Sequence, residues 1–585
     1  TLTGVGQADR GVSHLGAHVY RHSHFAYLGL MSSVGVAALE AAKKPITLYS
    51  AFVCFMFSYN LIVGTGALGF PLAFRDAGLV MAPVFVFLIA AVGYICVTFM
   101  IEAMAAGNAY LRTLERSMEQ DAQSQPSWLD PPGSHALVGS VQQSESPVEG
   151  EKQPLLTNSN SFMDKRYTIL ESEFNPESQH QELSTEDFEI HRQCEMASIA
   201  SYFFTPWGQR AFYICIIIYL FGDLAIYGVT VPTSLAGLFG GIPGFVDKNN
   251  AYYFYLLLFS LGACPFVYFD LSKTVYLQVL TLTVRVTAFL LMCSLAIAYC
   301  AEEEGSDPSK LAVFDVSKLP QMYGVAVYSF MCHHSLPSIV TPLRSKRNLF
   351  KIYLGVYIAV YCSYMLLSFT ADFAFGDITT PQDCSTSDSH ACSIQAPYTK
   401  NFLSYDFRAI GYFLNLFPVF VCWTSYPIIA ITLKKNLIQL FAGTISPAAD
   451  VARSRADKEL LQAGTGSAHP ATVAPKVPLW KRLLFPTIAG VLPLTIAVAT
   501  RDFELLVDIT GSYPGIGVEF VIPTLLVVFG RRWVQQQQST AKGGKVINLH
   551  RSPFHHKWWP WAIFGWVIVS FGLNTYNVIN KIMGN

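Results

Sequence analysis

One apolar stretch, residues 58–74 (SYNLIVGTGALGFPLAF), constrains the fold of this chain more than any other. It is apolar enough for a membrane helix, but Gly64, Thr65 and Gly66 stand at its middle and Pro71 follows them. A glycine inside a helix costs about 1 kcal/mol relative to alanine. Because freed backbone groups cannot face lipid, a break at membrane depth has to line a cavity enclosed by protein. We therefore expect a broken membrane helix whose free amides and carbonyls can bind a ligand.

A second apolar stretch, residues 321–343, is interrupted in the same way. His333, His334, Pro337 and Pro342 lie inside it. Two interrupted helices at corresponding positions in the two halves of a membrane protein point to a transporter built from inverted repeats. The two stretches together therefore predict a transporter with a central binding site.

The composition is typical of a membrane protein. Of the 585 residues, 52% are hydrophobic and only 14% are charged, whereas about a quarter of the residues in a soluble domain are charged. Many apolar runs are close to the roughly 20 residues that a helix needs to cross a bilayer. We expect an all-α polytopic protein that is embedded in the lipid bilayer. About eleven transmembrane helices are expected, at residues 49–74, 79–101, 211–236, 251–269, 275–299, 321–342, 352–375, 407–433, 483–500, 504–529 and 558–579.

Basic residues set the expected orientation, because they follow every second span. Lys434 and Lys435 follow the eighth span, and Arg531 and Arg532 follow the tenth. The intervening loops are acidic or mixed. The positive-inside rule therefore predicts a cytosolic N-terminus and, with an odd number of spans, a non-cytosolic C-terminus.

The spans divide the chain into two repeats and several extra segments. The first repeat is expected at 49–299 and the second at 321–529, with helix 558–579 outside them and a disordered cytosolic segment at 1–48. Residues 111–193 are rich in Ser, Gln, Glu and Pro, and we expect a disordered cytosolic insertion there. Residues 443–478 are rich in Ala, Ser, Gly and Pro, which predicts a flexible linker.

The first insertion contains a sorting-like pattern, EKQPLL, in which Glu151 precedes Leu155 and Leu156. It resembles the acidic dileucine signal that clathrin adaptors read when they sort proteins to endosomes and lysosomes. A chance match in an acidic segment is the alternative. With a clathrin adaptor as a partner, an endolysosomal membrane is favoured over the plasma membrane.

Cys384 and Cys392 lie in one hydrophilic loop between the seventh and eighth spans. The predicted orientation places this loop on the non-cytosolic side, where conditions are oxidising. We favour a disulfide bond between them, with two free thiols as the alternative.

Three motifs carry a resemblance to a known family. The first span reads NLIVGTGALGFP, the sixth reads YSFMCHHSLPSI and the tenth reads LVDITGSYPGIGVEFVIPTLL. They resemble the motifs of the amino acid/auxin permease family, within the amino acid/polyamine/organocation superfamily. The resemblance implies a leucine-transporter-like fold, in which spans one to five and six to ten form two inverted repeats and the eleventh is an extra helix.

The resemblance also implies where an amino acid would bind. Amides of Gly64, Thr65 and Gly66 would hold its carboxylate, because a helix N-terminus carries partial positive charge. The alternative is that these glycines only allow close helix packing. The sixth-span break would hold the amino group, with Cys332, His333, Ser335 and Pro337 around it.

Two coupling ions stay open, the proton and sodium. His333 titrates near neutral pH in its ordinary state, so it is a candidate for proton coupling, although a neutral imidazole that bonds a freed carbonyl is equally compatible. By analogy with relatives, Asn60 together with Thr424 and Ser425 of the eighth span could ligate sodium. No other cofactor is expected.

Asp223 and Arg285 stand near the middle of the third and fifth spans. A lone charge at that depth costs at least about 2.5 to 3.5 kcal/mol, so each needs a partner. We expect a buried ion pair between them, acting as a structural lock or as a gate, or Asp223 as a proton acceptor. Glu102, at the end of the second span, is expected at the interface.

These observations favour a secondary active transporter of amino acids, and neutral ones, because no charged residue stands at the first break. The alternative is an amino-acid-binding nutrient sensor with little transport. The pattern of an enzyme is absent, since no nucleophile with its base and no phosphate-binding loop is found. The sequence likewise lacks the ligand spacing of a metal site and the basic stripe of a nucleic-acid-binding protein.

Overall fold

The computed structural model describes residues 48–124, 183–241, 247, 250–268, 275–301, 306–377, 393–403, 408–442, 479–540 and 546–583. Cys384 and Cys392, the dileucine pattern and linker 443–478 lie outside the described residues. The cysteines among the described residues are all free thiols.

The described part of the chain is helical, and its only β pairing is an isolated bridge between Tyr49 and Leu343. The all-α prediction is therefore confirmed. The longer helices are α2 (Ala51–Ile62), α3 (Gly66–Ala77), α4 (Met81–Ser124), α6 (Met196–Phe203), α7 (Pro206–Phe239), α8 (Ala251–Ala263), α9 (Val275–Ala301), α10 (Leu319–Phe330), α12 (Leu349–Phe375), α13 (Arg408–Ala442), α15 (Leu479–Ala499), α16 (Phe503–Thr510), α17 (Ile522–Thr540) and α18 (Trp558–Met583). Short helices are η2 (Thr185–Phe188), η4 (Cys264–Tyr268), η5 (Pro308–Lys310), η6 (Val316–Lys318), η7 (His333–Ser335), α11 (Leu336–Val340) and η8 (Tyr398–Phe402), and two π-helical turns are η9 (Gly511–Gly515) and η10 (Gly517–Val521).

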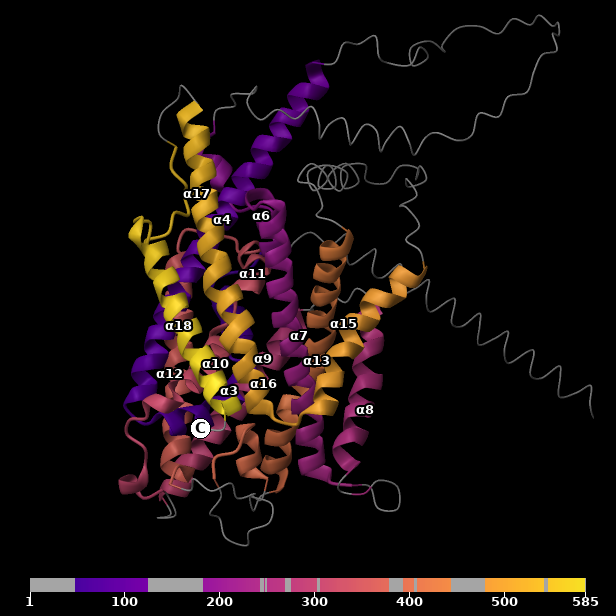
Figure 1. Ribbon diagram of the computed structural model, residues 1–585, viewed down its shortest axis with the longest axis vertical. Helices are drawn as coiled ribbons and strands as arrows, with labels where there is room; N and C mark the ends of the chain where they lie inside the picture. Colours follow the sequence, from indigo (N-terminus) through magenta and orange to yellow (C-terminus); the bar gives the residue numbers. More distant parts are fainter. Residues whose placement is uncertain are drawn as a thin grey trace, which may run out of the picture.

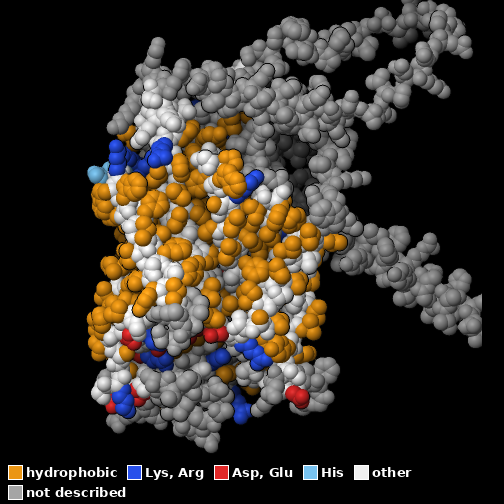
Figure 2. Space-filling model, in the orientation of Figure 1, with side chains coloured by type: hydrophobic (Ala, Val, Ile, Leu, Met, Phe, Trp, Pro, Cys, Tyr) orange, Lys and Arg blue, Asp and Glu red, His pale blue; other side chains and the backbone are white. Residues whose placement is uncertain are grey.

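Most helices run along the long axis of the molecule and form one bundle (Figure 1). Among the described residues, seven helices are long and apolar enough to cross a membrane, and the bent pair α2 and α3 makes an eighth span. Each expected span coincides with a helix or with consecutive helices, but α10 with α11, α15 and α18 are not among these eight, and the count of eleven is not confirmed. Hydrophobic side chains cover the middle of the surface and charged ones gather toward its two ends (Figure 2). The chain is a multi-pass membrane protein.

The broken helices lie at the centre of this bundle. Helix α3 packs against α10, and α10 also packs against α16 and η9. Helix α12 packs against α2, α3 and α4, so it contacts both halves of the first broken helix. Helices α7 and α13 pack against each other beside this centre. Both predicted breaks are therefore inside the protein, as the argument about unsatisfied backbone groups requires.

The expected disordered insertion at 111–193 is wrong at both of its ends. Helix α4 continues to Ser124, and Leu111 and Leu114 on it are buried. On the far side, Phe188 and Ile190 are completely buried. Low average hydropathy concealed these few apolar residues, which suffice to anchor the ends of a polar segment.

Polar contacts hold the returning segment against α4. The Oδ1 atom of Asn108 accepts hydrogen bonds from the backbone amides of His191 and Arg192, at 3.2 and 2.9 Å. Arg116 forms an ion pair with Asp187. Burial alone would raise the pKa of Asp187, but hydrogen bonds from Arg116 and Ser184 outweigh it and lower that pKa from its ordinary value of 3.8.

The expectation for Glu102 is also wrong, because its side chain is buried rather than interfacial. Arg531 of α17 donates two hydrogen bonds to its carboxylate, at 2.8 and 2.6 Å. The amide of Ser552 donates a third, at 3.1 Å. A fork of two parallel bonds is a strong and specific geometry, so this pair fastens α4 to α17.

Candidate transport site

The first break turns the chain sharply between α2 and α3. The two helices are bent by 61° relative to each other. The amide of Val63 still bonds to Tyr59, at 2.9 Å, and the amide of Gly64 bonds to Ile62, at 2.7 Å. In the described structure the next backbone hydrogen bond is donated by Leu68 to Thr65. The amides at the start of α3 are thus available to an anionic group, as expected for a helix N-terminus.

The two glycines of the break differ in their surroundings. A Cβ atom at Gly66 would lie 2.9 Å from the Cα atom of Ser329 on α10, which is too close for any side chain. A Cβ atom at Gly64 would have no neighbour closer than the carbonyl oxygen of Ile62, at 3.8 Å. Close helix packing therefore accounts for Gly66 but leaves Gly64 without a packing reason.

The second break separates α10 from α11 by two non-helical residues and the short helix η7. Cys332 lies with its Sγ atom 3.6 Å from the hydroxyl of Tyr357. His333 is completely buried, and its Nε2 atom lies 3.2 Å from the carbonyl oxygen of Gly93 on α4. Ser335 is only partly buried. The contacts of Cys332 and His333 thus go to α12 and α4, away from Thr65.

One tyrosine connects the two breaks. The hydroxyl of Tyr364 on α12 lies 3.2 Å from the carbonyl oxygen of Ile62 and 2.9 Å from that of Ser329. These carbonyls stand at the ends of α2 and α10, where a helix leaves acceptors without helical partners, and the Ile62 carbonyl also accepts from the amide of Gly64. The ring stacks on Phe70 of α3 with centroids 4.7 Å apart. Tyr364 therefore ties both broken helices to α12.

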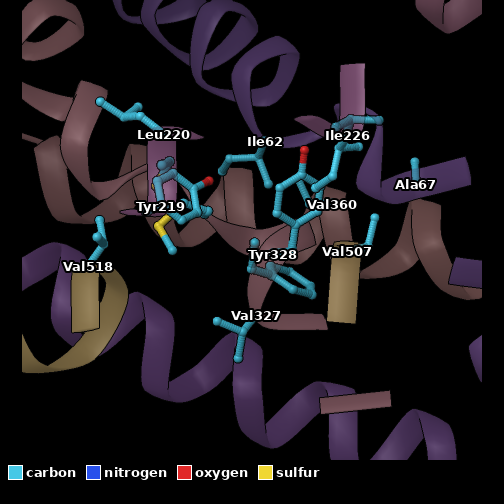
Figure 3. Close-up of a cluster of buried hydrophobic side chains, with 14 of the residues drawn as sticks. Ile62, Ala67, Tyr219, Leu220, Ile226, Val327, Tyr328, Val360, Val507 and Val518 are labelled. Carbon is cyan, nitrogen blue, oxygen red and sulfur yellow. The ribbon is translucent and has the colours of Figure 1, made fainter. Parts of the chain in front are cut away.

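A second tyrosine closes a hydrogen-bonded chain at the first break. Tyr328 on α10 donates to Asp223 of α7 at 2.6 Å, and its oxygen lies 2.9 Å from the Oγ1 atom of Thr65. Because Tyr328 has one proton and gives it to Asp223, Thr65 is the donor in the other bond. Figure 3 shows Tyr328 among apolar side chains that include Ile62, Ala67 and Val507. The chain joins three elements at the start of α3.

The ion pair expected between Asp223 and Arg285 is not among the contacts of the described residues. Arg285 instead donates to the backbone oxygen of Asn60 and, at 2.9 Å, to its Oδ1 atom. Since α2 ends at Ile62 and Gly64 bonds elsewhere, the Asn60 carbonyl lacks its helical partner. Arg285 satisfies this carbonyl, which explains the choice of partner. Asp223 and Arg285 nevertheless both lie close enough to Tyr227 to interact electrostatically with its hydroxyl, so they share one region of the bundle.

The residues considered for sodium are engaged in other contacts. Asn60 is bound to Arg285 and, at 3.4 Å, to Thr281 on α9. The hydroxyl of Thr424 donates back to carbonyls of its own helix, at 3.0 and 3.1 Å. Ser425 is half-buried on α13. These contacts do not bring the three side chains into one oxygen cage.

Comparison with known proteins agrees with the motifs. The profile of the family described as "Transmembrane amino acid transporter protein" matches residues 191–541. Transmembrane protein 104 of Homo sapiens is 36% identical over 558 residues, which is 91% of this chain and 97% of that protein. The homologue in Dictyostelium discoideum is 34% identical over 91% of this chain and 97% of its own length. The homologue in Drosophila melanogaster is 32% identical over 93% of this chain and 99% of its own length.

Among solved structures, one titled as MhsT in complex with L-phenylalanine aligns with a TM-score of 0.40 and 13% identity, covering 90% of this chain and 99% of that one. The family profile covers more than half of the chain, and the relatives cover at least 91% of it. The chain therefore belongs to the transmembrane amino acid transporter family.

Proposed function

We propose that this protein is a secondary active transporter of neutral amino acids that alternates access around its two broken helices. The family supports amino acid transport. The observation that carries the mechanism is the convergence of both breaks on Tyr364, with the start of α3 joined to Tyr328 and Asp223. A site at this place can respond to a ligand through both halves of the bundle.

In this proposal the substrate carboxylate binds the amides at the start of α3, near Gly64 and Thr65. The substrate amino group binds at the C-terminal end of α10. There the carbonyl oxygens of Ser329 and Phe330 accept hydrogen bonds from hydroxyls on α12. A carboxylate at Thr65 competes for the hydroxyl that now bonds Tyr328. Binding therefore loosens the contact between α3 and α10, which is the change that alternating access needs.

The proposed coupling ion is the proton. The sodium candidates are engaged by Arg285 and by backbone carbonyls, whereas Asp223 already takes part in a hydrogen-bonded chain. An endolysosomal membrane, which the sequence pattern at Glu151, Leu155 and Leu156 favours, maintains a proton gradient that such a transporter can use.

Transport in proteoliposomes tests the proposal. Purified protein is given radiolabelled neutral amino acids under an imposed pH gradient and, separately, under a sodium gradient. One pH unit is worth about 1.4 kcal/mol, so one proton per substrate allows up to about tenfold accumulation. Accumulation under the pH gradient supports the proposal, and binding without accumulation under either gradient contradicts it and favours a sensor.

The variant Gly66→Val supplies the structural control. A side chain at Gly66 collides with Ser329, so we expect transport to fall to background. The matched variant Gly565→Val adds the same atoms to α18, where no neighbour lies within 4 Å. It should transport like the unmodified protein. Equal transport by both variants would show that the α3–α10 contact does not matter.

A further inference from the structure

A second buried carboxyl, outside the hydrogen-bonded chain at the first break, has no hydrogen-bond partner in the described structure. Glu519 lies on the π-helical turn η10, and its side chain is completely buried. Neither of its oxygens has a hydrogen-bond partner among the described residues. An ionised carboxylate in such a place is very costly, so the carboxyl is held there as the neutral acid.

The surroundings of Glu519 are closely packed and uncharged. A Cβ atom at Gly93 of α4 would lie 2.7 Å from its Oε1 atom, so the carboxyl in its present position packs directly against this glycine. The titratable groups that face it are hydroxyls and thiols from α4, α7, α10, α12 and the second break, namely Cys96, Tyr219, Tyr323, Tyr357 and Cys332. None of the ion pairs among the described residues includes Glu519, so no Lys or Arg neutralises it there.

Glu519 also lies next to the second break. The carbonyl of Gly93 is the group that His333 contacts, at 3.2 Å. The other ring nitrogen of His333 has no hydrogen-bond partner in the described structure. An acid from η10 and an imidazole from η7 thus both lie against one glycine of α4.

The backbone around Glu519 is irregular in a way that suits a moving part. Residues 511–515 and 517–521 form two π-helical turns in succession. Such turns occur mostly as single interruptions of α-helices and are frequent at functional sites. They widen the helix and leave amides and carbonyls less constrained than in an α-helix.

We propose that Glu519 is the proton-binding residue that couples transport to the pH gradient, and that His333 receives its proton during the cycle. The step is a proton transfer: the O–H bond of the Glu519 carboxyl breaks, an N–H bond forms on the imidazole, and no other bond changes. The role of Glu519 in a transport cycle rests on the proposed transport function. The protonation of Glu519 does not depend on that function.

Infrared difference spectroscopy on the purified full chain tests the protonation directly. A pH jump should alter a carbonyl band of a protonated carboxyl in the unmodified protein. That band should be missing in Glu519→Gln and retained in Glu186→Gln, which removes an exposed acid. The same band in all three proteins would overturn the proposal, whether or not the protein transports anything.

Transport then tests the coupling. In Glu519→Gln, accumulation driven by one pH unit should fall from up to about tenfold to no accumulation. Exchange of labelled for unlabelled substrate, which needs no net proton movement, should persist, and Glu519→Asp should recover part of the accumulation. If the unmodified protein exchanges substrate and Glu519→Gln still accumulates it, the role of Glu519 is refuted and the transport function stands. If the unmodified protein neither exchanges nor accumulates any amino acid, the transport function fails and the coupling role fails with it.

Discussion

Two buried glutamates lie at helix α4, Glu102 on the helix itself and Glu519 packed against it, and their hydrogen bonding differs. Near the middle of α4, Glu102 receives two hydrogen bonds from Arg531 and one from Ser552. Closer to the N-terminus of α4, beside Gly93, Glu519 receives none in the described structure. Three donors hold the Glu102 carboxylate in place, whereas no donor in the described structure fixes the carboxyl of Glu519. The first suits a permanent connection, and the second suits a group that changes state.

Breaking the ion pair between Glu102 and Arg531 should have the largest effect on stability. Arg531→Ala leaves the Glu102 carboxylate buried without its cation, and loss of one partner of a buried pair costs about 3 to 5 kcal/mol. We expect a marked fall in the midpoint of thermal unfolding in detergent.

The control for this prediction removes both charges. Glu102→Gln with Arg531→Met takes away the uncompensated charge and should recover much of the lost stability, because the cost comes from the orphaned ion rather than from the missing pair. If Arg531→Ala unfolds at the same temperature as the unmodified protein, the connection between α4 and α17 is not structural.

Removal of the Tyr328 hydroxyl should have an intermediate effect. Tyr328→Phe keeps the ring but takes away the donor to Asp223 and the acceptor for Thr65. A buried polar group left without its partner costs about 1 to 3 kcal/mol. We expect a lower unfolding midpoint together with tighter substrate binding, measured by the displacement of labelled amino acid, because the Thr65 hydroxyl no longer has to leave Tyr328 before it can donate to a carboxylate.

The variant Tyr323→Phe distinguishes the loss of the Tyr328 hydrogen bonds from a general change in the packing of α10. Tyr323 lies on the same helix, but the polar side chains beside its hydroxyl are Ser570 and Trp566 of α18 rather than Thr65 or Asp223. Substrate binding should therefore be unchanged in Tyr323→Phe. A similar change of binding in both variants would assign the effect to the general packing of α10.

The smallest effect is expected at Asp187, where the partner is partly exposed. The pKa of Asp187 is lowered in the folded protein, so its contribution to stability is present above the ordinary value of 3.8 and is lost as the pH falls through the folded-state pKa. Asp187→Asn should cost about 1 kcal/mol or less at neutral pH. The difference from the unmodified protein should shrink in acid, as measured by unfolding midpoints over a pH series. A difference that stays constant would exclude the ion pair with Arg116 as its source.

Both breaks could be predicted from the sequence, because glycine and proline act locally on a helix. The need of Asp223 and Arg285 for partners was also visible, since burial of a charge is costly wherever it occurs. Which partner each finds depends on packing between distant helices. The free carbonyl of Asn60 arises only because α2 ends where it does, and no sequence pattern marks it.

The tyrosines at the centre could not be predicted for the same reason. Tyr328 and Tyr364 look like ordinary aromatic residues of apolar spans, and their roles appear only when α7, α10 and α12 are placed together. Glu519 was visible as an acid in an apolar motif, although its lack of a partner was not. The ordered ends of segment 111–193 were missed because composition describes an average, whereas anchoring depends on a few residues such as Phe188.

Tyr364 carries a single hydroxyl proton and has two carbonyls within reach. It can satisfy either acceptor fully only at the expense of the other. If one half-helix end moves away in the proposed transport cycle, the whole bond passes to the other carbonyl, and the return movement reverses the exchange. The hydroxyl proton of Tyr364 then has an acceptor in both arrangements.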